Sequence, residues 1–371
     1  MVLCQRECTA AAVYTQNKVQ GAPITITREN ISNGRAWGIL VNSGNANTCN
    51  PDGLDVARKC CALAAQATGL RPEDFVLAST GVIGQALPIE PFAEGIPALV
   101  PALSEGGSTL AARAIMTTDT VEKEFAVEFT VEGTRCRLGA IGKGSGMIDP
   151  NMATMLVFLT TDANIAPDML QQALRREVAG TLNQICIDGD MSTNDTTAIL
   201  ASGMAGNAPI IGEGEAFDVF CAALREVLVR MARALAADGE GATKLLECRV
   251  SGAPDESLAR AIAKSVISSD LVKAAMFGED ANWGRVLCAI GYAPGAFSVE
   301  HVSVAMQSAA GQVQVCKDAA HLPYSEEQAA LVLAQDVIEI LVDLGQGEAS
   351  GIAWGCDLSY DYVKINGDYR T

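Results

Sequence analysis

Histidine is almost absent from this sequence: it occurs twice, as His301 and His321. Zinc sites and Ser–His or Cys–His catalysis usually depend on a well-placed imidazole. Neither histidine stands beside a glycine-rich or polar cluster. If the protein is an enzyme, we therefore expect its general base to be a different group, and we expect no metal site.

Long hydrophobic runs are missing as well. No run approaches the ~20 apolar residues that a membrane-spanning helix needs, and the opening residues MVLCQRECTA lack the pattern of a signal peptide. We expect a cytosolic protein without a membrane partner. The chain has 371 residues, 49% of them hydrophobic, which is enough for a large core and for more than one domain.

An excess of basic residues is also lacking, because the formal net charge is -18. An acidic protein repels phosphate backbones, so we expect no nucleic-acid partner. A small anionic substrate remains compatible with this charge, since one Lys or Arg in a pocket sets the local field. The twelve cysteines include no CxxC pair, which favours reduced thiols that serve as small hydrophobic residues.

The hydrophobic pattern predicts alternating strands and helices in the first part of the chain. Strands are expected at 11–15, 36–44, 75–79, 154–161 and 244–250, with a hairpin over 121–141. Helices are expected at 52–70, 166–184, 216–235 and, with a break at 268–269, 255–277. After Arg285 the pattern changes to strands, including 337–344 and 350–366, around one helix at 325–333. This change predicts a smaller α+β unit.

The most informative feature is the junction between Ala153 and Thr154. A segment rich in Gly, Pro and Asn ends there, and an apolar strand begins with a hydroxyl residue. N-terminal-nucleophile enzymes use such a residue to attack the preceding carbonyl, and after cleavage its free α-amine serves as the base. The ordinary pKa of a terminal amine, about 7.7–8, suits that role. From pattern alone, a threonine that merely starts a strand is the stronger alternative.

Two glycine-containing turns could carry chemistry or be only structural. Thr80-Gly81 follows a predicted strand, and a glycine there would let a backbone N–H donate to an oxyanion; an ordinary turn is the alternative. Lys143 lies in a glycine-rich loop that lacks the full phosphate-loop pattern, and a lone lysine in such a loop is more often solvated.

Two acidic turns are similarly ambiguous. The segment 188–199 imitates a calcium loop, but its sixth position is Thr193 rather than Gly and its twelfth is Ile199 rather than Glu, so we reject a calcium hand. Glu240 stands in the turn DGEGA, where it could be a surface acid or could hold a substrate ammonium.

Seven segments together resemble the ornithine acetyltransferase family, also called the bifunctional glutamate N-acetyltransferases of arginine biosynthesis. They occur in the family's order and run nearly from end to end, and seven in order are highly specific. The segments are LVNSGNAN (40–47), STGVIG (79–84), KGSGMIDPNMATML (143–156), DGDMSTNDT (188–196), DGEGAT (238–243), NWGR (282–285) and YVKINGDYRT (362–371).

The resemblance implies a self-processing fold. It would be an α+β fold: a four-layer α-β-β-α sandwich of the N-terminal-nucleophile type over 1–285, with a smaller C-terminal α+β domain over 286–371. Cleavage between Ala153 and Thr154 would give an α chain (1–153) and a β chain (154–371) that stay associated, as α2β2. Family members usually have an additional N-terminal segment with a first strand, whereas this chain begins close to what looks like the second strand.

The resemblance also implies the roles of individual residues. Thr154 would be the nucleophile that carries an acetyl ester, and Thr80 and Gly81 would form the oxyanion hole. Lys143 would neutralise the substrate α-carboxylate, and Glu240 would engage its amine side. The substrate-contacting positions would be Thr117, Lys143, Thr154, Glu240, Asn366 and Thr371.

The implied reaction is a ping-pong acetyl transfer. N-acetylornithine would acetylate Thr154, ornithine would leave, and glutamate would take the acetyl group to give N-acetylglutamate. Because an amide becomes an ester and then an amide again, no nucleotide and no cofactor is needed; some family members also accept acetyl-CoA as the donor. The alternatives are an amidase or aminopeptidase of the same fold, in which water resolves the acyl-enzyme, and an unprocessed binding protein.

Overall fold

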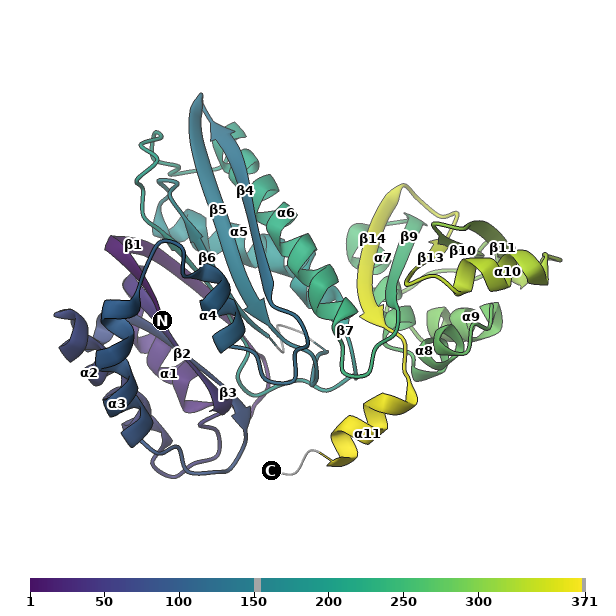
Figure 1. Ribbon diagram of the computed structural model, residues 1–371. Helices are drawn as coiled ribbons and strands as arrows, with labels where there is room; N and C mark the ends of the chain where they lie inside the picture. The colour runs from purple at the N-terminus through teal and green to yellow at the C-terminus, as the bar shows by residue number, and fades with distance from the viewer. Residues whose placement is uncertain (150–154, 369–371) are drawn as a thin grey trace.

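Two mixed β-sheets with helices packed on them make up the protein (Figure 1). The computed structural model describes residues 1–149 and 155–368, and within these ranges each sheet has seven strands. Figure 1 shows the first sheet and its helices on the left and the second sheet on the right. No helix within the described ranges is long and apolar enough to cross a membrane. The predicted α+β class is confirmed.

The first sheet has the strand order β3-β2-β1-β8-β6-β5-β4. Its strands are β1 (Val2–Tyr14), β2 (Arg35–Asn45), β3 (Phe75–Val82), β4 (Lys123–Val131), β5 (Thr134–Lys143), β6 (Leu156–Thr161) and β8 (Thr196–Ala201). The strand β1 is much longer than the strand predicted at 11–15. β6 runs parallel to β8 and antiparallel to β5, and Leu156 is paired with Thr196 on one side and Lys143 on the other. The start of β6 therefore lies between the end of β5 and the start of β8.

Alternation along the strands divides this sheet into two apolar faces. Ala11 and Val13 of β1 belong to one cluster, and Ala10 and Ala12 belong to another. The first face packs against α5 (Pro167–Ala179) and α6 (Glu215–Ala237), and at the β2–β3 end against α1 (Ala22–Asn30) and α2 (Gly53–Thr68) with α3 (Glu90–Leu99). The opposite face packs against α4 (Ser108–Ala114).

The second sheet has the order β12-β11-β10-β13-β9-β14-β7. Its strands are β7 (Ile185–Cys186), β9 (Leu245–Ala253), β10 (Ser303–Ser308), β11 (Gly311–Lys317), β12 (Ala320–His321), β13 (Val337–Asp343) and β14 (Ala349–Cys356). The helices in its apolar cluster are α7 (Glu256–Ile267), α8 (Asp270–Phe277), α9 (Trp283–Gly291) and α10 (Glu326–Leu333). The expected boundary at 285–286 falls inside α9, and this sheet combines strands from both sides of it.

The helix α6 connects the two sheets. It contacts β4 and β5 of the first sheet and β7, β9 and β14 of the second. Its predicted apolar stripe is confirmed, since the following side chains are all buried: Phe217, Phe220, Leu224, Val227, Leu228, Met231 and Leu235. Burying one such side chain contributes about 1.5–3 kcal/mol relative to exposure, so the stripe fixes α6, and the turn that follows it, against both sheets.

Two other sequence predictions have different outcomes. The predicted helix over 255–277 does break at Ser268–Ser269, where the Ser269 hydroxyl accepts the Val272 N–H and starts α8. The strand predicted over 350–366 is wrong beyond Cys356, because α11 (Tyr360–Asp368) follows instead. Ser359 begins that change, since its hydroxyl accepts the Asp361 N–H. Three short 3-10 helices complete the described elements: η1 (Pro72–Asp74), η2 (Val100–Ala102) and η3 (Leu182–Gln184).

Charge and cysteine chemistry agree with the composition. All twelve cysteines lie within the described ranges, and each is free and most are buried.

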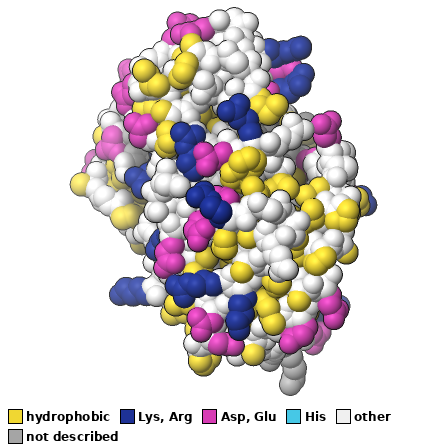
Figure 2. Space-filling view, turned by 90° about the vertical axis from the view of Figure 1, so that its left-hand side faces the viewer, with side chains coloured by type: hydrophobic (Ala, Val, Ile, Leu, Met, Phe, Trp, Pro, Cys, Tyr) yellow, Lys and Arg dark blue, Asp and Glu magenta, His cyan; other side chains and the backbone are white. Residues whose placement is uncertain are grey.

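Figure 2 shows the face to the left of Figure 1, where Lys and Arg side chains follow the middle of the surface with acidic and hydrophobic side chains beside them. The large negative net charge therefore does not form one continuous acidic patch on this face.

Candidate active site

The predicted cleavage position lies outside the described residues. This applies to Ala153 and Thr154, and also to the predicted substrate contact Thr371. Met155 is the first described residue after the junction; it is buried, and its carbonyl accepts the Thr196 N–H at 3.1 Å. The surroundings of the candidate site are therefore defined by the described residues near the start of β6.

Lys143, at the end of β5, is a buried cation, with a side chain only 9% exposed. Its Nζ atom lies 3.8 Å from Oδ2 of Asp119. Burial lowers the pKa of Lys143, while the negative charges of Asp119, Asp195 and Glu240 oppose that shift. The sequence favoured a solvated lysine. The structure instead buries Lys143 on β5, the strand that pairs directly with β6.

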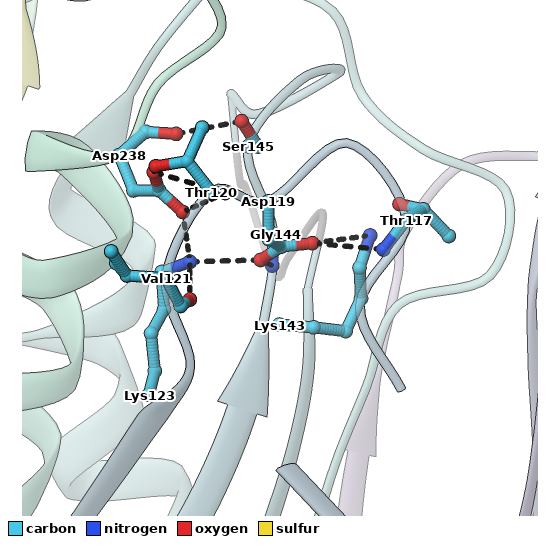
Figure 3. A network of polar contacts seen from close by, with 9 residues as sticks. All are labelled: Thr117, Asp119, Thr120, Val121, Lys123, Lys143, Gly144, Ser145 and Asp238. Atoms are coloured by element: carbon cyan, nitrogen blue, oxygen red, sulfur yellow. Dashed lines mark hydrogen bonds and ion pairs between the residues drawn. The ribbon is translucent and has the colours of Figure 1, made fainter. Parts of the chain in front are cut away.

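A network of buried charges holds the segment before β4 against the ends of β5 and α6 (Figure 3). Lys123 Nζ donates to Asp119 Oδ1 at 2.8 Å and to Asp238 Oδ2 at 2.5 Å. Asp119 Oδ1 also accepts the Gly144 N–H at 2.7 Å. Burial alone would raise the pKa of Asp119, but the ammonium groups of Lys143 and Lys123 outweigh it and lower that pKa.

The same network brings three predicted substrate-binding residues into one region. Thr117 donates its N–H to Asp119 Oδ2 at 3.2 Å, and Lys143 lies against the same carboxylate. Ser145 donates its hydroxyl to the Asp238 carbonyl at 2.6 Å and accepts the Glu240 N–H at 2.8 Å through its own carbonyl. The position of Glu240 is therefore fixed relative to the loop that follows Lys143.

Glu240 is also close to Asn366, another of the substrate-contacting positions that the resemblance implies. Asn366 Nδ2 donates to Glu240 Oε2 at 2.8 Å, which joins α11 to the turn after α6. Gly146 allows this carboxylate to lie against the loop, since a Cβ at that position would come within 2.4 Å of the Glu240 carboxyl carbon. The half-buried carboxylate and the buried Lys143 thus present opposite charges in one region.

Thr80 and Gly81 form the end of β3, at another part of the sheet. Gly81 has a φ of +127°, and a Cβ there would lie 2.2 Å from the Gly44 carbonyl carbon of β2, so glycine is required for this strand pairing. Among the described residues, no hydrogen bond or ion pair joins Thr80 or Gly81 to Lys143. What connects β3 to the region of β6 is Asn194, whose Nδ2 donates to Ser79 O at 2.9 Å and to Ala46 O at 2.6 Å.

The loop before β8 contains carboxylates whose contacts the sequence did not show. Asp188 accepts the N–H groups of Met147 and Ile148 at 2.6 and 2.8 Å, and burial raises its pKa. Asp195, directly before β8, is buried as well. The calcium-like spacing drew attention to this loop, but Asp119 and Lys123 gave no comparable signal, because charged residues near a strand are usually solvated.

Metal-ligating clusters and histidines do not contribute to this region. Within the described ranges, no group of three or more His, Cys, Asp or Glu side chains could hold a metal ion. His301 is exposed beside Asp318, and His321 stacks on Trp283 with 5.9 Å between ring centroids. Both histidines lie with the second sheet.

Comparisons with known proteins give full-length matches. The ArgJ family model matches residues 1–371. The chain is 46% identical over 372 residues to a protein of Caldanaerobacter subterraneus subsp. tengcongensis, covering 100% of this chain and 92% of the relative. It is 47% identical over 365 residues to one of Symbiobacterium thermophilum, with 98% and 90% covered. Both relatives are named arginine biosynthesis bifunctional protein ArgJ.

Solved structures give partial matches. A crystal structure of the arginine biosynthesis bifunctional protein ArgJ from Bacillus halodurans is 42% identical with a TM-score of 0.53, covering 58% of this chain and 98% of that chain. An ornithine acetyltransferase from Mycobacterium tuberculosis, solved with ornithine, is 31% identical with a TM-score of 0.37, covering 40% of this chain and 79% of its own.

Proposed function

The chain belongs to the ArgJ family, and we propose that it transfers the acetyl group of N-acetylornithine to glutamate through an acetyl ester on Thr154. The observation that carries this proposal is the family match over the whole chain, with relatives that are named for arginine biosynthesis. The protein is thus an acyltransferase of amino-acid biosynthesis. The full-length family match outweighs the alternative function, an amidase or aminopeptidase of the same fold.

Self-cleavage between Ala153 and Thr154 prepares the nucleophile. The Thr154 hydroxyl attacks the Ala153 carbonyl, the amide becomes an ester, and water releases the α chain and leaves a free α-amine on Thr154. That amine then takes the proton of the hydroxyl during catalysis, so no histidine is needed.

Lys143 and Glu240 bind the two charged ends of the amino-acid substrate. The buried ammonium of Lys143 stands on the strand paired with β6 and is 3.8 Å from Asp119, so it can also donate to a substrate α-carboxylate. Glu240, held by Asn366, accepts the amine side. Thr117 and Thr371 complete the contacts, and Thr80 and Gly81 donate to the oxyanion of the tetrahedral intermediate.

The two half-reactions share one acyl-enzyme. N-acetylornithine gives up its acetyl group to Thr154, and glutamate then attacks the ester to form N-acetylglutamate. No cofactor is required, because one amide is exchanged for another and the overall reaction is close to balanced. The word bifunctional in the names of the relatives favours acetyl-CoA as a second donor. We place the enzyme in the cytoplasm as an α2β2 assembly.

Intact-mass measurement of the purified protein tests the proposal. We expect two chains with the masses of 1–153 and 154–371, and acetyl transfer from N-acetylornithine to glutamate. The Thr154→Ala variant should remain one uncut chain without transferase activity. A wild-type preparation that is active and consists of one unbroken polypeptide contradicts the mechanism.

Product analysis separates transfer from hydrolysis. Incubation with N-acetylornithine and glutamate should yield N-acetylglutamate. If acetate is released at the same rate with and without glutamate, and no N-acetylglutamate forms, the protein is a hydrolase of the same fold.

A further inference from the structure

Asn194 is a buried residue to which the proposed reaction gives no role. It stands in the loop before β8, and only 6% of it is exposed. Its side-chain Nδ2 donates to two main-chain carbonyls, that of Ala46 at 2.6 Å and that of Ser79 at 2.9 Å. Ala46 directly follows β2, and Ser79 lies near the end of β3. One side chain therefore joins the ends of two neighbouring strands to the loop before β8.

The amide oxygen of Asn194 has partners as well. Oδ1 accepts the Thr48 hydroxyl at 2.5 Å and the Thr193 hydroxyl at 2.6 Å. A primary amide has two donor hydrogens and two acceptor lone pairs, so all four hydrogen-bonding positions of Asn194 are occupied. Gly21 leaves room for this arrangement, because a Cβ there would lie 2.7 Å from Asn194 Nδ2. A buried network that is fully satisfied in this way specifies a single geometry.

The loop after β2 also holds the turn that ends β3. Ala46 donates its N–H to the Val82 carbonyl at 2.9 Å, and Gly84 donates its N–H to the Thr48 carbonyl at 3.0 Å. Asn194 binds the same loop twice, through the Ala46 carbonyl and the Thr48 hydroxyl. The turn therefore lies against a loop whose position Asn194 fixes.

We propose that Asn194 is a positioning residue for the oxyanion hole: by holding the Ser79 carbonyl and the loop after β2, it fixes how Thr80 and Gly81 present their donors. This inference rests on the proposed function, which assigns the oxyanion hole to those two residues. The coupling is direct, because the Ser79 carbonyl and the Thr80 N–H belong to one planar peptide unit. A hydrogen bond to that carbonyl thus also sets the direction of the Thr80 N–H.

The position of these donors affects the chemical step. Oxyanion donors stabilise a transition state because they are already in place when the charge develops. A displacement of about 1 Å at a reacting centre can lower a rate roughly 100-fold. Loss of the Asn194 contacts should therefore slow the reaction without weakening the binding of substrate by Lys143 and Glu240.

The experiment compares Asn194→Asp with the wild type as purified, cleaved enzymes. Aspartate keeps the size of asparagine but has at most one donor, so it cannot hold the Ala46 and Ser79 carbonyls together. We expect kcat for acetyl transfer to fall about tenfold or more. Both half-reactions pass through the same oxyanion hole and slow together, so the KM values for N-acetylornithine and for glutamate should stay within about twofold.

Asn207 provides a matched control. It is also buried, its Oδ1 accepts the Asn164 N–H at 2.8 Å, and its Nδ2 donates to the Ala208 carbonyl at 2.8 Å. Asn164 follows the end of β6, whereas the candidate site lies at the start of that strand. Asn207→Asp should lower thermal stability and leave kcat and both KM values within about twofold of the wild type.

Thr48 offers a second pair of variants, which decides the question even if Asn194→Asp fails to fold. Thr48→Val removes the hydroxyl that Asn194 Oδ1 accepts, whereas Thr48→Ser keeps it. We expect Thr48→Val to lower kcat about threefold or more with both KM values unchanged. Thr48→Ser should keep kcat within about twofold, because the hydrogen bond to Asn194 is retained.

Three results overturn the inference. Asn194→Asp could fold and keep the wild-type kcat, or Thr48→Val could be as active as Thr48→Ser. Alternatively, Asn207→Asp could lose kcat as strongly as Asn194→Asp, which would mean that both amides act only through stability. The wild-type enzyme is assayed in parallel. If the wild type is active as one unbroken polypeptide, the proposed function fails instead, independently of Asn194.

Discussion

Lys143 is the residue whose environment differs most from the expectation based on sequence. Its pattern, a lysine among glycines, also fits an exposed loop, and the sequence contains nothing that would reveal the Asp119 carboxylate 3.8 Å away. The burial depends on Lys123 and Asp238, which are 20 and 95 positions distant in the chain. Local pattern cannot predict such a site, because the partners meet only after the sheet and α6 have packed.

Replacing Lys143 by Met tests its role in substrate binding. We expect KM for N-acetylornithine to rise by about tenfold or more, since a charge-assisted hydrogen bond contributes about 1.5–3 kcal/mol. Self-cleavage should continue, because it needs Thr154 rather than a bound substrate. Steady-state kinetics and the cleaved fraction on a denaturing gel measure the two effects. Equal losses of cleavage and of substrate binding would instead indicate a role in maturation.

Gly81 and Gly84 allow a comparison of two glycines in the same turn. Both have positive φ, but a Cβ at Gly81 would overlap the backbone of β2, whereas a Cβ at Gly84 would meet no atom within 4 Å. Gly84→Ala should cost about 1–2 kcal/mol, the penalty of a left-handed backbone. Gly81→Ala should cost about 3 kcal/mol or more, because the strand pairing must also shift. Urea unfolding of both variants measures this, and equal costs would contradict the close approach.

Among the elements, the long helices and the hairpin could be predicted, because their apolar periodicity is strong. The helix α6 and the hairpin β4–β5 lie where the pattern placed them. The helix α11 could not be predicted, because its residues contribute no buried stripe. What fixes its start is Ser359, whose hydroxyl binds both the Asp361 N–H and the Gly241 carbonyl, and this second partner is distant in sequence.

The charge network that joins the segment before β4, β5 and α6 gives the protein a pH-dependent element of stability. The pKa of Asp119 is lowered in the folded state, so its contribution is fully present above its unfolded pKa of about 3.9 and is lost as the pH falls through the folded value. Asp119→Asn should lower the free energy of unfolding by about 3–5 kcal/mol at pH 7, since it leaves buried ammonium groups undercompensated.

Thermal unfolding at several pH values checks this expectation. The difference in Tm between the wild type and Asp119→Asn should be large at pH 7 and should shrink below about pH 4, where the wild-type carboxylate takes up a proton. The exposed Arg113–Glu122 pair serves as a control, because Glu122→Gln should change Tm little at any pH. A wild-type-to-variant difference that stays constant down to pH 2 would show that the carboxylate charge does not stabilise the fold.

At the scale of the whole molecule, the α+β class followed from the element pattern, but the composition of the sheets did not. The second sheet places β9 between β13 and β14, although β13 and β14 come long after β9 in the chain. Such pairings depend on the packing of α7 and α6 on β9 and β14, and no spacing in the sequence specifies them. The boundary predicted at 285–286 rests on a change in the sequence pattern. The strand pairing of the second sheet instead joins residues from both sides of that position.

The order of the first sheet also determines how a cleaved enzyme holds together. Cleavage after residue 153 assigns β1 to β5 to one chain and β6 and β8 to the other, and β8 and β6 lie between β1 and β5. Separating the chains would break the β1–β8 and β5–β6 ladders and expose both apolar faces. The two chains should therefore coelute in one peak on native size-exclusion chromatography and separate only in denaturant. Their separation under native conditions would contradict the interleaved sheet.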